Sequence, residues 1–345
     1  MHRLIFWGII ILAAVLLFAL VGIIIYWVLR LLLAKPEART ASLCLIGALT
    51  LLIAASCVWG HLHTRLQVDV KTVECYSNRL PKAFEGFCIA QLSDMHLGSF
   101  TPEEGRDLLF RLADSIAVQQ PDVIVFTGDL VTLRSAEAIP FREGLKRLAQ
   151  IPSSKGEGYI PVYSILGNHD YADYVRSFTP ERRQQDVDSL IALQEEAGWH
   201  MLRNEGICIE RGDSTHTERI ALVGVENIGE PPFSVYGDLN KAIRTLGDSL
   251  SPANTFTVLL SHNPTHWRSE ALASRIDLML AGHTHAMQMV IGGWSPSQWK
   301  YPEWMGLYSE GQQHLYVNTG TGCVGPAIRI GVAPEVTVIT IRNEE

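Results

Sequence analysis

The sequence predicts an α/β domain that follows a transmembrane hairpin of two helices. Two observations indicate this fold class: residues 1–65 contain two long uncharged stretches, and beyond residue 86 short apolar runs alternate with helix-like segments. A third observation is that five short blocks of polar residues each follow directly on an apolar run. We therefore expect residues 1–65 to form the hairpin, residues 66–85 a linker with an entry strand, and residues 86–345 one large domain.

The hairpin prediction rests on length and charge. Asp, Glu, Lys and Arg are absent from Leu4–Val28 and from Ala41–Gly60. As helices, stretches of this length can cross ~30 Å of hydrocarbon and satisfy their own backbone hydrogen bonds. We expect the helices at about 4–29 and 41–62, with a turn near Pro36. Basic residues nearly balance on the two sides of the hairpin, so the side of the membrane that holds the domain stays open.

Each stretch has an alternative reading. The first could be a cleaved signal peptide, but its apolar run is longer than the usual run of about 7–15 residues. The second contains Gly47, Ser56 and Gly60 and could be a buried helix. Small residues are also common where membrane helices pack, and we therefore keep the spanning interpretation.

The charge of the domain argues against nucleic acid as a partner. The whole chain has a formal net charge of −8, and without residues 1–65, which hold five Lys/Arg and one Asp/Glu, the charge is −12. General nucleic-acid binding depends on Lys and Arg meeting phosphates. The six cysteines lack CxxC spacing, so neither a disulfide framework nor a thiolate zinc site is expected. We predict no protein partner.

Apolar runs and amphipathic segments give the expected order of elements, which favours a layered α/β core. We expect strands at Val68–Val73, Phe87–Leu92, Val123–Phe126, Tyr159–Leu166, Phe256–Leu260, Asp277–Leu280, Met287–Ile291, His314–Asn318 and Val336–Ile341. A meander is expected at Met201–Asn204, Ile207–Arg211 and Arg219–Val223. We expect helices at Pro102–Gln119, Glu137–Ala149, Arg182–Ala197, Leu239–Leu246 and Trp267–Ala273.

The polar blocks follow predicted strands and are expected to meet in one site, because ligand sites in α/β sheets lie outside the carboxyl ends of strands. Taken singly, each block has an ordinary explanation as a turn, a cap or a pair of surface histidines. Their joint occurrence predicts a shared site. The blocks are Ser93-Asp94-Met95-His96, Gly128-Asp129, Gly167-Asn168-His169-Asp170, Ser261-His262-Asn263 and Gly282-His283-Thr284-His285.

The residue types in these blocks predict a site for two divalent metal ions. Carboxylate, amide and imidazole ligands without thiolates suit Mn, Fe or Zn, with Co and Ni also allowed. A two-metal site holds its ions about 3.5–4 Å apart around a bridging water, which becomes a hydroxide that attacks phosphorus. One carboxylate must then contact both ions, and we assign Asp129. The first ion would be completed by Asp94, His96 and His285, and the second by Asn168, His262 and His283.

Two block residues are left for catalysis. His169 lies one position from Asn168, so we expect it to face the substrate and protonate the leaving oxygen or stabilise its charge. Asp170 is expected either to orient His169 or to cap the following helix. The sequence identifies no other substrate contact. We expect Arg329 to be a surface residue, with bidentate binding of a substrate phosphate as the alternative. We expect the aromatic residues after the last block to pack a long loop, with an acyl or membrane-interface contact as the alternative. These residues are Trp294, Trp299, Tyr301, Trp304 and Tyr308.

The order of the blocks, D-x-H, G-D, G-N-H-[DE], H and G-H-x-H, resembles the calcineurin-like metallophosphoesterase superfamily over roughly residues 86–345. The resemblance implies a four-layer αββα sandwich with a dinuclear centre. The anchor, Leu80-Pro81, the Gly167-to-Tyr171 stretch and Trp294–Trp304 resemble a bacterial membrane-associated branch similar to UDP-2,3-diacylglucosamine pyrophosphatases of lipid A synthesis. The branch also contains phosphodiesterases of unsettled substrate. Together with the two predicted helices, it implies a multi-pass protein of the bacterial inner membrane.

The sequence departs from the superfamily at two places. Its protein phosphatases carry Asp-Arg-Gly shortly after the Gly-Asp block, whereas Leu130-Val131-Thr132-Leu133 follows Asp129 here. A phosphoprotein substrate is therefore disfavoured. Gly often follows the last His in this branch, and Ala286 stands there instead, a change that we expect to leave the metal site intact.

These features predict a metal-dependent hydrolase of phosphodiester or pyrophosphate bonds. The anchor favours a lipid-linked or cell-envelope substrate, because it confines the site to the bilayer surface. Two alternatives are a non-catalytic metal-binding membrane scaffold or sensor, and a phosphomonoesterase with a soluble substrate. The presence of all seven expected ligands together with His169 favours the enzyme.

Overall fold

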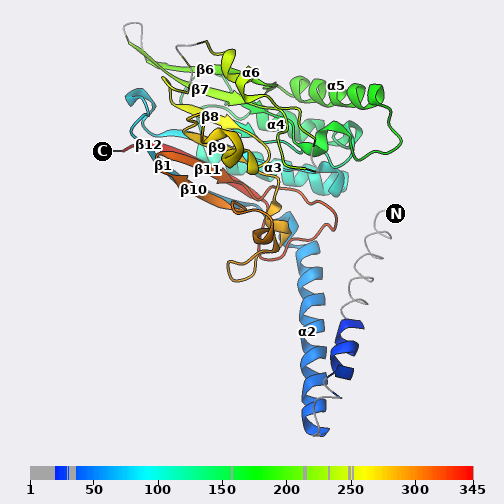
Figure 1. Cartoon of the computed structure of the whole chain (residues 1–345). Helices are drawn as coiled ribbons and strands as arrows, with labels where there is room; N and C mark the ends of the chain where they lie inside the picture. Colours follow the sequence, from blue (N-terminus) through cyan, green and yellow to red (C-terminus); the bar gives the residue numbers. More distant parts are fainter. Residues whose placement is uncertain are drawn as a thin grey trace.

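A long helix projects from a layered domain in the computed structural model (Figure 1). The structure describes residues 20–28, 30, 36–156, 158–212, 216–231, 234–247, 250 and 252–344. The projecting helix is α2 (Pro36–Leu62), and Thr40–Leu66 is the one helical stretch among the described residues that is long and apolar enough to cross a membrane. The described residues that precede the domain therefore supply one candidate membrane span.

The first predicted membrane helix, about 4–29, lies largely outside the described residues, although residues 20–28 are helical. A Cβ atom added at Gly22 would lie 2.7 Å from Ile46 Cγ2, so this segment touches α2. Helix α2 begins at Pro36 rather than near residue 41, because proline suits the first turn of a helix, where its missing N–H has no partner to lose. The two-helix hairpin stays a prediction.

The described strands form two six-stranded sheets. The first sheet has the order β1 (Asp69–Ser77), β12 (Glu335–Asn343), β2 (Phe87–Leu92), β3 (Val123–Phe126), β4 (Val162–Ser164) and β5 (Trp199–Met201). The second has the order β10 (Gly306–Glu310), β11 (Gln313–Val317), β9 (Leu278–Ala281), β8 (Thr257–Leu260), β7 (Thr217–Gly224) and β6 (Glu205–Gly212). Strands β2, β3 and β4 are parallel neighbours, as are β8 and β9, so each group delivers its carboxyl ends to one edge.

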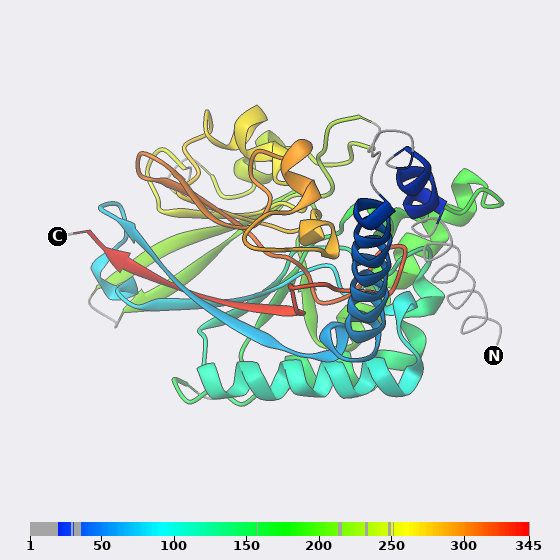
Figure 2. The same cartoon turned by 90° about the horizontal axis from the view of Figure 1, so that it is seen from below.

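Three hydrophobic clusters of the described residues separate four layers, an order that agrees with the implied αββα sandwich (Figures 1 and 2). The first cluster packs α3 (Pro102–Gln119), α4 (Arg142–Ala149) and α5 (Pro180–Glu196) on the first sheet. The second fills the space between the sheets. The third packs α6 (Leu239–Arg244) and the π-helical turn η8 (Trp267–Ala271) on the second sheet. Alternation along β2 explains the division, since Ile89 joins the inter-sheet cluster and Ala90 the helix side.

Two expectations about strands were wrong. The predicted meander does not form, because β5 pairs with β4 in the first sheet whereas β6 and β7 pair in the second. Trp199 of β5 packs against Phe126 in the core under the helices, with ring centroids 5.4 Å apart. The expected strand Met287–Ile291 is replaced by the 3-10 turn η9 (His285–Gln288), whose backbone is left-handed.

The carboxyl end of α2 is fixed to the loop that precedes β12. His61 Nδ1 donates to the Ala327 carbonyl at 2.8 Å. A Cβ atom added at Gly60 would lie 2.6 Å from the Arg329 carbonyl oxygen, so only a glycine fits at this contact without a shift. The end of the candidate membrane helix is therefore packed into the domain.

Arg329 and Arg65 strengthen this junction from inside. Arg329 is fully buried, and its guanidinium donates to the carbonyls of Thr319, Gly320 and Gly322. The expectation of a surface residue was wrong, because Arg329 neutralises the carbonyl dipoles of a loop that turns back on itself. Arg65, which is also buried, forms an ion pair with Glu104 of α3.

We expect Gly60→Ala to lower the thermal unfolding midpoint of the full chain, because the added methyl overpacks against Arg329 and overpacking costs about 1–3 kcal/mol. Gly47→Ala in the same helix is the matched control: a Cβ there meets nothing within 4 Å, and alanine favours a helix by about 1 kcal/mol over glycine. Thermal unfolding in detergent followed by circular dichroism measures both. Equal effects of the two changes would contradict the packed junction.

Candidate metal centre

The backbone that carries the predicted ligands is strained. Asp94, His96, Asp129, His283 and His285 all have left-handed φ angles between 40° and 71°. Side-chain-bearing residues populate this region rarely, at a cost of order 1 kcal/mol or more each, and such strain concentrates at functional sites. The turns that follow β2, β3 and β9 thus adopt an unfavourable backbone conformation that directs the predicted ligand side chains towards one site.

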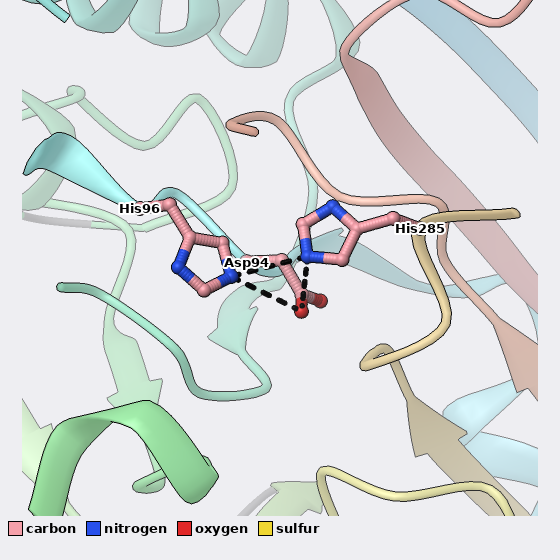
Figure 3. Close-up of side chains that lie close together, drawn as sticks. All are labelled: Asp94, His96 and His285. Atoms are coloured by element: carbon pink, nitrogen blue, oxygen red, sulfur yellow. Dashed lines mark hydrogen bonds and ion pairs between the residues drawn. The ribbon is translucent and has the colours of Figure 1, made fainter. Parts of the chain in front are cut away.

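Asp94, His96 and His285 converge on one point (Figure 3). His285 Nε2 lies 3.1 Å from Asp94 Oδ1 and 3.1 Å from His96 Nε2, and His96 Nε2 lies 3.9 Å from Asp94 Oδ1. All three side chains are buried, and their ligand atoms lie within 4.8 Å of one another. This group, cluster 1, has the size and donors of a single cation site.

Asp129, His262 and His283 form a second group, cluster 2, with Asn168 beside it. Asp129 Oδ2 lies 3.1 Å from His262 Nε2, and His262 Nε2 lies 3.3 Å from His283 Nδ1. Asn168 Oδ1 is 2.8 Å from the same His283 nitrogen. The seven predicted ligands therefore fall into the two sets of neighbours that the sequence suggested.

Asp129 lies between the clusters. Its Oδ2 atom, 3.1 Å from His262 in cluster 2, is also 3.5 Å from His96 Nε2 in cluster 1. One carboxylate oxygen thus faces both groups of ligand atoms, which is the position that a ligand shared by two ions requires.

Hydrogen bonds to outer atoms orient these ligands. His262 Nδ1 donates to the Thr127 carbonyl at 2.7 Å, which leaves Nε2 to face the site. Asn168 Nδ2 donates to the Tyr174 hydroxyl at 2.8 Å, which turns Oδ1 inward. His283 Nε2 lies 3.0 Å from the Tyr301 hydroxyl. Such partners fix ring orientation and tune ligand strength.

Tyr301 is a site residue that sequence reasoning missed. It belongs to the aromatic stretch that we expected to pack a loop, and it is buried as expected. Its hydroxyl nevertheless contacts a predicted ligand, and its ring lies edge-on to that of His283. The signal in the sequence was an aromatic residue shortly after the last metal block.

The charges of the buried groups fit metal cations. Burial opposes ionisation of Asp94 and Asp129, but neighbouring histidines hold the pKa of both carboxyls below the usual value. Burial lowers the pKa of His262, yet the charge of Asp129 raises it to about 9. Burial and the charge of His262 lower the pKa of His283 to about 3. The site therefore holds two buried anionic carboxylates that demand positive charge, and its oxygen and imidazole donors suit divalent metals.

Two motif glycines are required by close approach. A Cβ atom at Gly167 would lie 2.2 Å from Asp129 Oδ1, and one at Gly282 would lie 2.1 Å from Asp94 Oδ2. Ala286 stands where a glycine is common and has a φ of 50°, in a region that favours glycine. The backbone makes the same tight turn with alanine at this position, and His285 reaches cluster 1.

Asp170 is a buried clamp between two ligand loops. Its Oδ2 accepts from the backbone N–H of Asp129 at 2.8 Å and of Gly167 at 2.9 Å, and its Oδ1 accepts from Val131 at 3.2 Å. Burial and the charge of Asp129 raise the pKa of Asp170 to about 7. These contacts favour a positioning role over the expected contact with His169, and the bond from Gly167 also caps the short 3-10 helix η6 (Asn168–Tyr171).

His169 faces the cavity above the clusters. Its Nδ1 donates to the Thr132 carbonyl at 2.7 Å, so Nε2 is the ring atom that can meet a substrate. Its ring lies edge-on to His96, with centroids 4.9 Å apart. The cavity has a volume of about 610 Å³ and is lined at this end by Asp129, Asn168, His169, His283 and His285.

Known proteins resemble this chain in the same region. Residues 88–287 match the family model described as calcineurin-like phosphoesterase. The chain is 31% identical to a transmembrane protein with metallophosphoesterase domain from Bos taurus, over 88% of this chain and 64% of that protein. The protein of the same description from Danio rerio is 29% identical, over 85% and 62%. An uncharacterized metallophosphoesterase of Bacillus subtilis is 30% identical, over 77% and 83%. The matches thus cover less than two thirds of the two vertebrate proteins.

We expect Tyr301→Phe to weaken metal binding about 10–100-fold, because the change removes the hydroxyl beside His283 and keeps the ring. Isothermal titration calorimetry of the metal-free protein with Mn²⁺ measures the affinities. Tyr159→Phe is the matched control, since Tyr159 is 59% exposed and lies outside the cavity lining. An unchanged affinity for both sites in Tyr301→Phe would show that the hydroxyl does not tune His283.

Proposed function

Because the chain belongs to the calcineurin-like phosphoesterase family, we propose that it is a metal-dependent hydrolase that cleaves a phosphodiester or pyrophosphate bond. The observation that carries the proposal is the position of Asp129 Oδ2, which lies within 3.5 Å of ligand nitrogens in both clusters. A buried oxygen so placed supports a pair of cations side by side rather than two independent sites.

Two divalent ions would be held by Asp94, His96, Asp129, Asn168, His262, His283 and His285. Bound there, they would supply Lewis acidity at the phosphoryl oxygens and lower the pKa of water. The donor set suits Mn, Fe or Zn and does not choose among them.

Two other residues of the site would position the ligand loops and protonate the leaving oxygen. His169 would give a proton to the leaving oxygen from Nε2 when both ring nitrogens carry a proton, because the Thr132 carbonyl keeps the other ring proton on Nδ1. Asp170 would keep the loops of Asp129 and Gly167 in register through its three accepted hydrogen bonds. Its role is structural support of the ligands.

The substrate that we propose is lipid-linked or part of the cell envelope. Helix α2 supports this, since it is long and apolar enough to span a bilayer and its end is packed beside the domain. The relatives named as transmembrane proteins support a membrane location. A multi-pass protein of the bacterial inner membrane, the branch similar to UDP-2,3-diacylglucosamine pyrophosphatases and a place in lipid A synthesis remain our predictions from the sequence.

Two other functions are weighed against this one. A metal-binding membrane scaffold or sensor would need the clusters but not His169 at the cavity wall. A phosphomonoesterase on a soluble substrate would need the metals but no apolar extension of the cavity. The half-buried His169 and the apolar lining of the cavity favour the diesterase or pyrophosphatase.

We expect His169→Ala to lower kcat on bis(p-nitrophenyl) phosphate about 10²–10⁴-fold, which is the usual contribution of a general acid. The bound Mn²⁺, measured by mass spectrometry of the purified protein, should stay unchanged because His169 lies outside both clusters. His200→Ala, at an exposed histidine of β5, is the control and should keep wild-type kcat.

The same assay separates the alternatives. A scaffold would bind Mn²⁺ without turning over either bis(p-nitrophenyl) phosphate or p-nitrophenyl phosphate. A monoesterase would prefer p-nitrophenyl phosphate. Full activity of His169→Ala on the diester would remove His169 from the reaction.

A further inference from the structure

The cavity above the metal clusters continues away from them between apolar side chains. One end is lined by the predicted ligands and His169, and the rest of the wall is formed mainly by Cys57, Met287, Met289, Pro326, Ile328 and Ile330. We call this apolar part the tail groove. It is one space with the candidate active site, so a molecule whose phosphate lies at the clusters places its substituent along these side chains.

The tail groove ends at the candidate membrane helix. Cys57 belongs to α2, within the stretch Thr40–Leu66 that could span a bilayer. Three and four residues further on, Gly60 and His61 fix this helix to residues 327–329, a stretch that includes Ile328 of the groove and precedes Ile330. The groove therefore connects the metal clusters with the place where the helix leaves the domain.

Exposed apolar side chains lie beside this place. Trp299 is 80% exposed, Ile291 is 59% exposed and Met287 is 48% exposed. Figures 1 and 2 both show the orange segment around residues 285–300 at the end of the domain from which α2 projects. Exposed Trp beside a membrane helix is typical of the membrane–water interface. The exposure of Trp299 fits the alternative of a membrane-interface contact rather than the packing of a loop.

We propose that the tail groove binds an acyl chain of a lipid phosphate ester, with the phosphate at the metal clusters and the chain running past Met289 and Ile328 towards Cys57. The proposal rests on the proposed function, which it deepens by naming the substrate class and the residues that select it. The chain would enter the groove from the bilayer beside α2.

Chemistry favours an acyl chain over a polar substituent. A sugar or nucleoside in the tail groove would lose hydrogen bonds to water and meet mostly apolar walls in return. Each methylene that leaves water for such a wall strengthens binding about fourfold. The volume of about 610 Å³ lies within the range of about 300–1,000 Å³ of small-molecule sites. Methionines such as Met287 and Met289 adapt to flexible chains.

The first test is a chain-length series. We would measure kcat/KM of the Mn²⁺-loaded full chain in nanodiscs with p-nitrophenyl alkyl phosphodiesters from ethyl to octyl. We expect kcat/KM to rise at least tenfold across the series, and Ile328→Asp to abolish most of that rise because it places a charge in the groove. Val118→Asp, at a residue of α3 that is 79% exposed, is the matched control and should keep the rise.

The second test does not depend on turnover. An alkylphosphonate with a diazirine in the middle of its alkyl chain is photolysed with the full chain in nanodiscs, and the labelled peptides are identified. We expect label on residues 287–289 and 324–330, reduced by an unlabelled dodecylphosphonate and by Ile328→Asp, but not by Val118→Asp. Label on α2 alone would reflect probe dissolved in the bilayer and would count against the groove.

The two tests separate two kinds of failure. Hydrolysis of all esters at equal kcat/KM, without label at residues 287–289 or 324–330, overturns the lipid proposal and leaves the hydrolase standing. Label in the groove without hydrolysis of any ester overturns the proposed function and leaves a lipid-phosphate binding site.

Discussion

The rest of the site depends on the burial of the Asp129 carboxylate between two groups of histidines. An ionised carboxylate in this position is tolerated only with positive charge close to it. The glycines at 167 and 282 let the loops approach closely enough to surround it and Asp94. Asp170 ties the backbone of Asp129 to Gly167. A cation on each side of Asp129 would satisfy the same demand, so the electrostatic requirement and the proposed chemistry have one origin.

The two-sheet architecture is what brings these groups together. Asp94, Asp129 and Asn168 follow parallel strands of the first sheet, whereas His262, His283 and His285 follow parallel strands of the second. Neither sheet could supply both clusters alone, because each cluster contains residues from both. The inter-sheet core that includes Ile89, Val258 and Leu280 fixes the distance between the strand ends. Packing far from the cavity thus sets the spacing of the ligand atoms.

Local sequence patterns were sufficient to predict those elements whose bounds depend on their own residues. The bounds of β2, α3 and β3 agree with the sequence prediction, because the continuous apolar runs and the Thr101 capping box are local signals. The blocks at strand ends then implied a shared site. Features decided by distant contacts were missed: β5 joins the first sheet through Trp199, Arg329 is buried by the carbonyls that it serves, and Tyr301 reaches His283 across a loop. The sequence of these segments carries no local signal that identifies the distant residues they contact.

The junction at the end of α2 makes the candidate membrane helix part of the globular fold. Arg65 joins Glu104 of the first helix layer, and Gly60 lies against the loop that Arg329 organises. A protein cut after residue 66 would therefore lose Cys57 from the lining of its cavity and leave the Glu104 carboxylate without the guanidinium of Arg65. The candidate membrane helix and the domain are packed together at this junction, so a tilt of the helix would turn the whole layered domain with it.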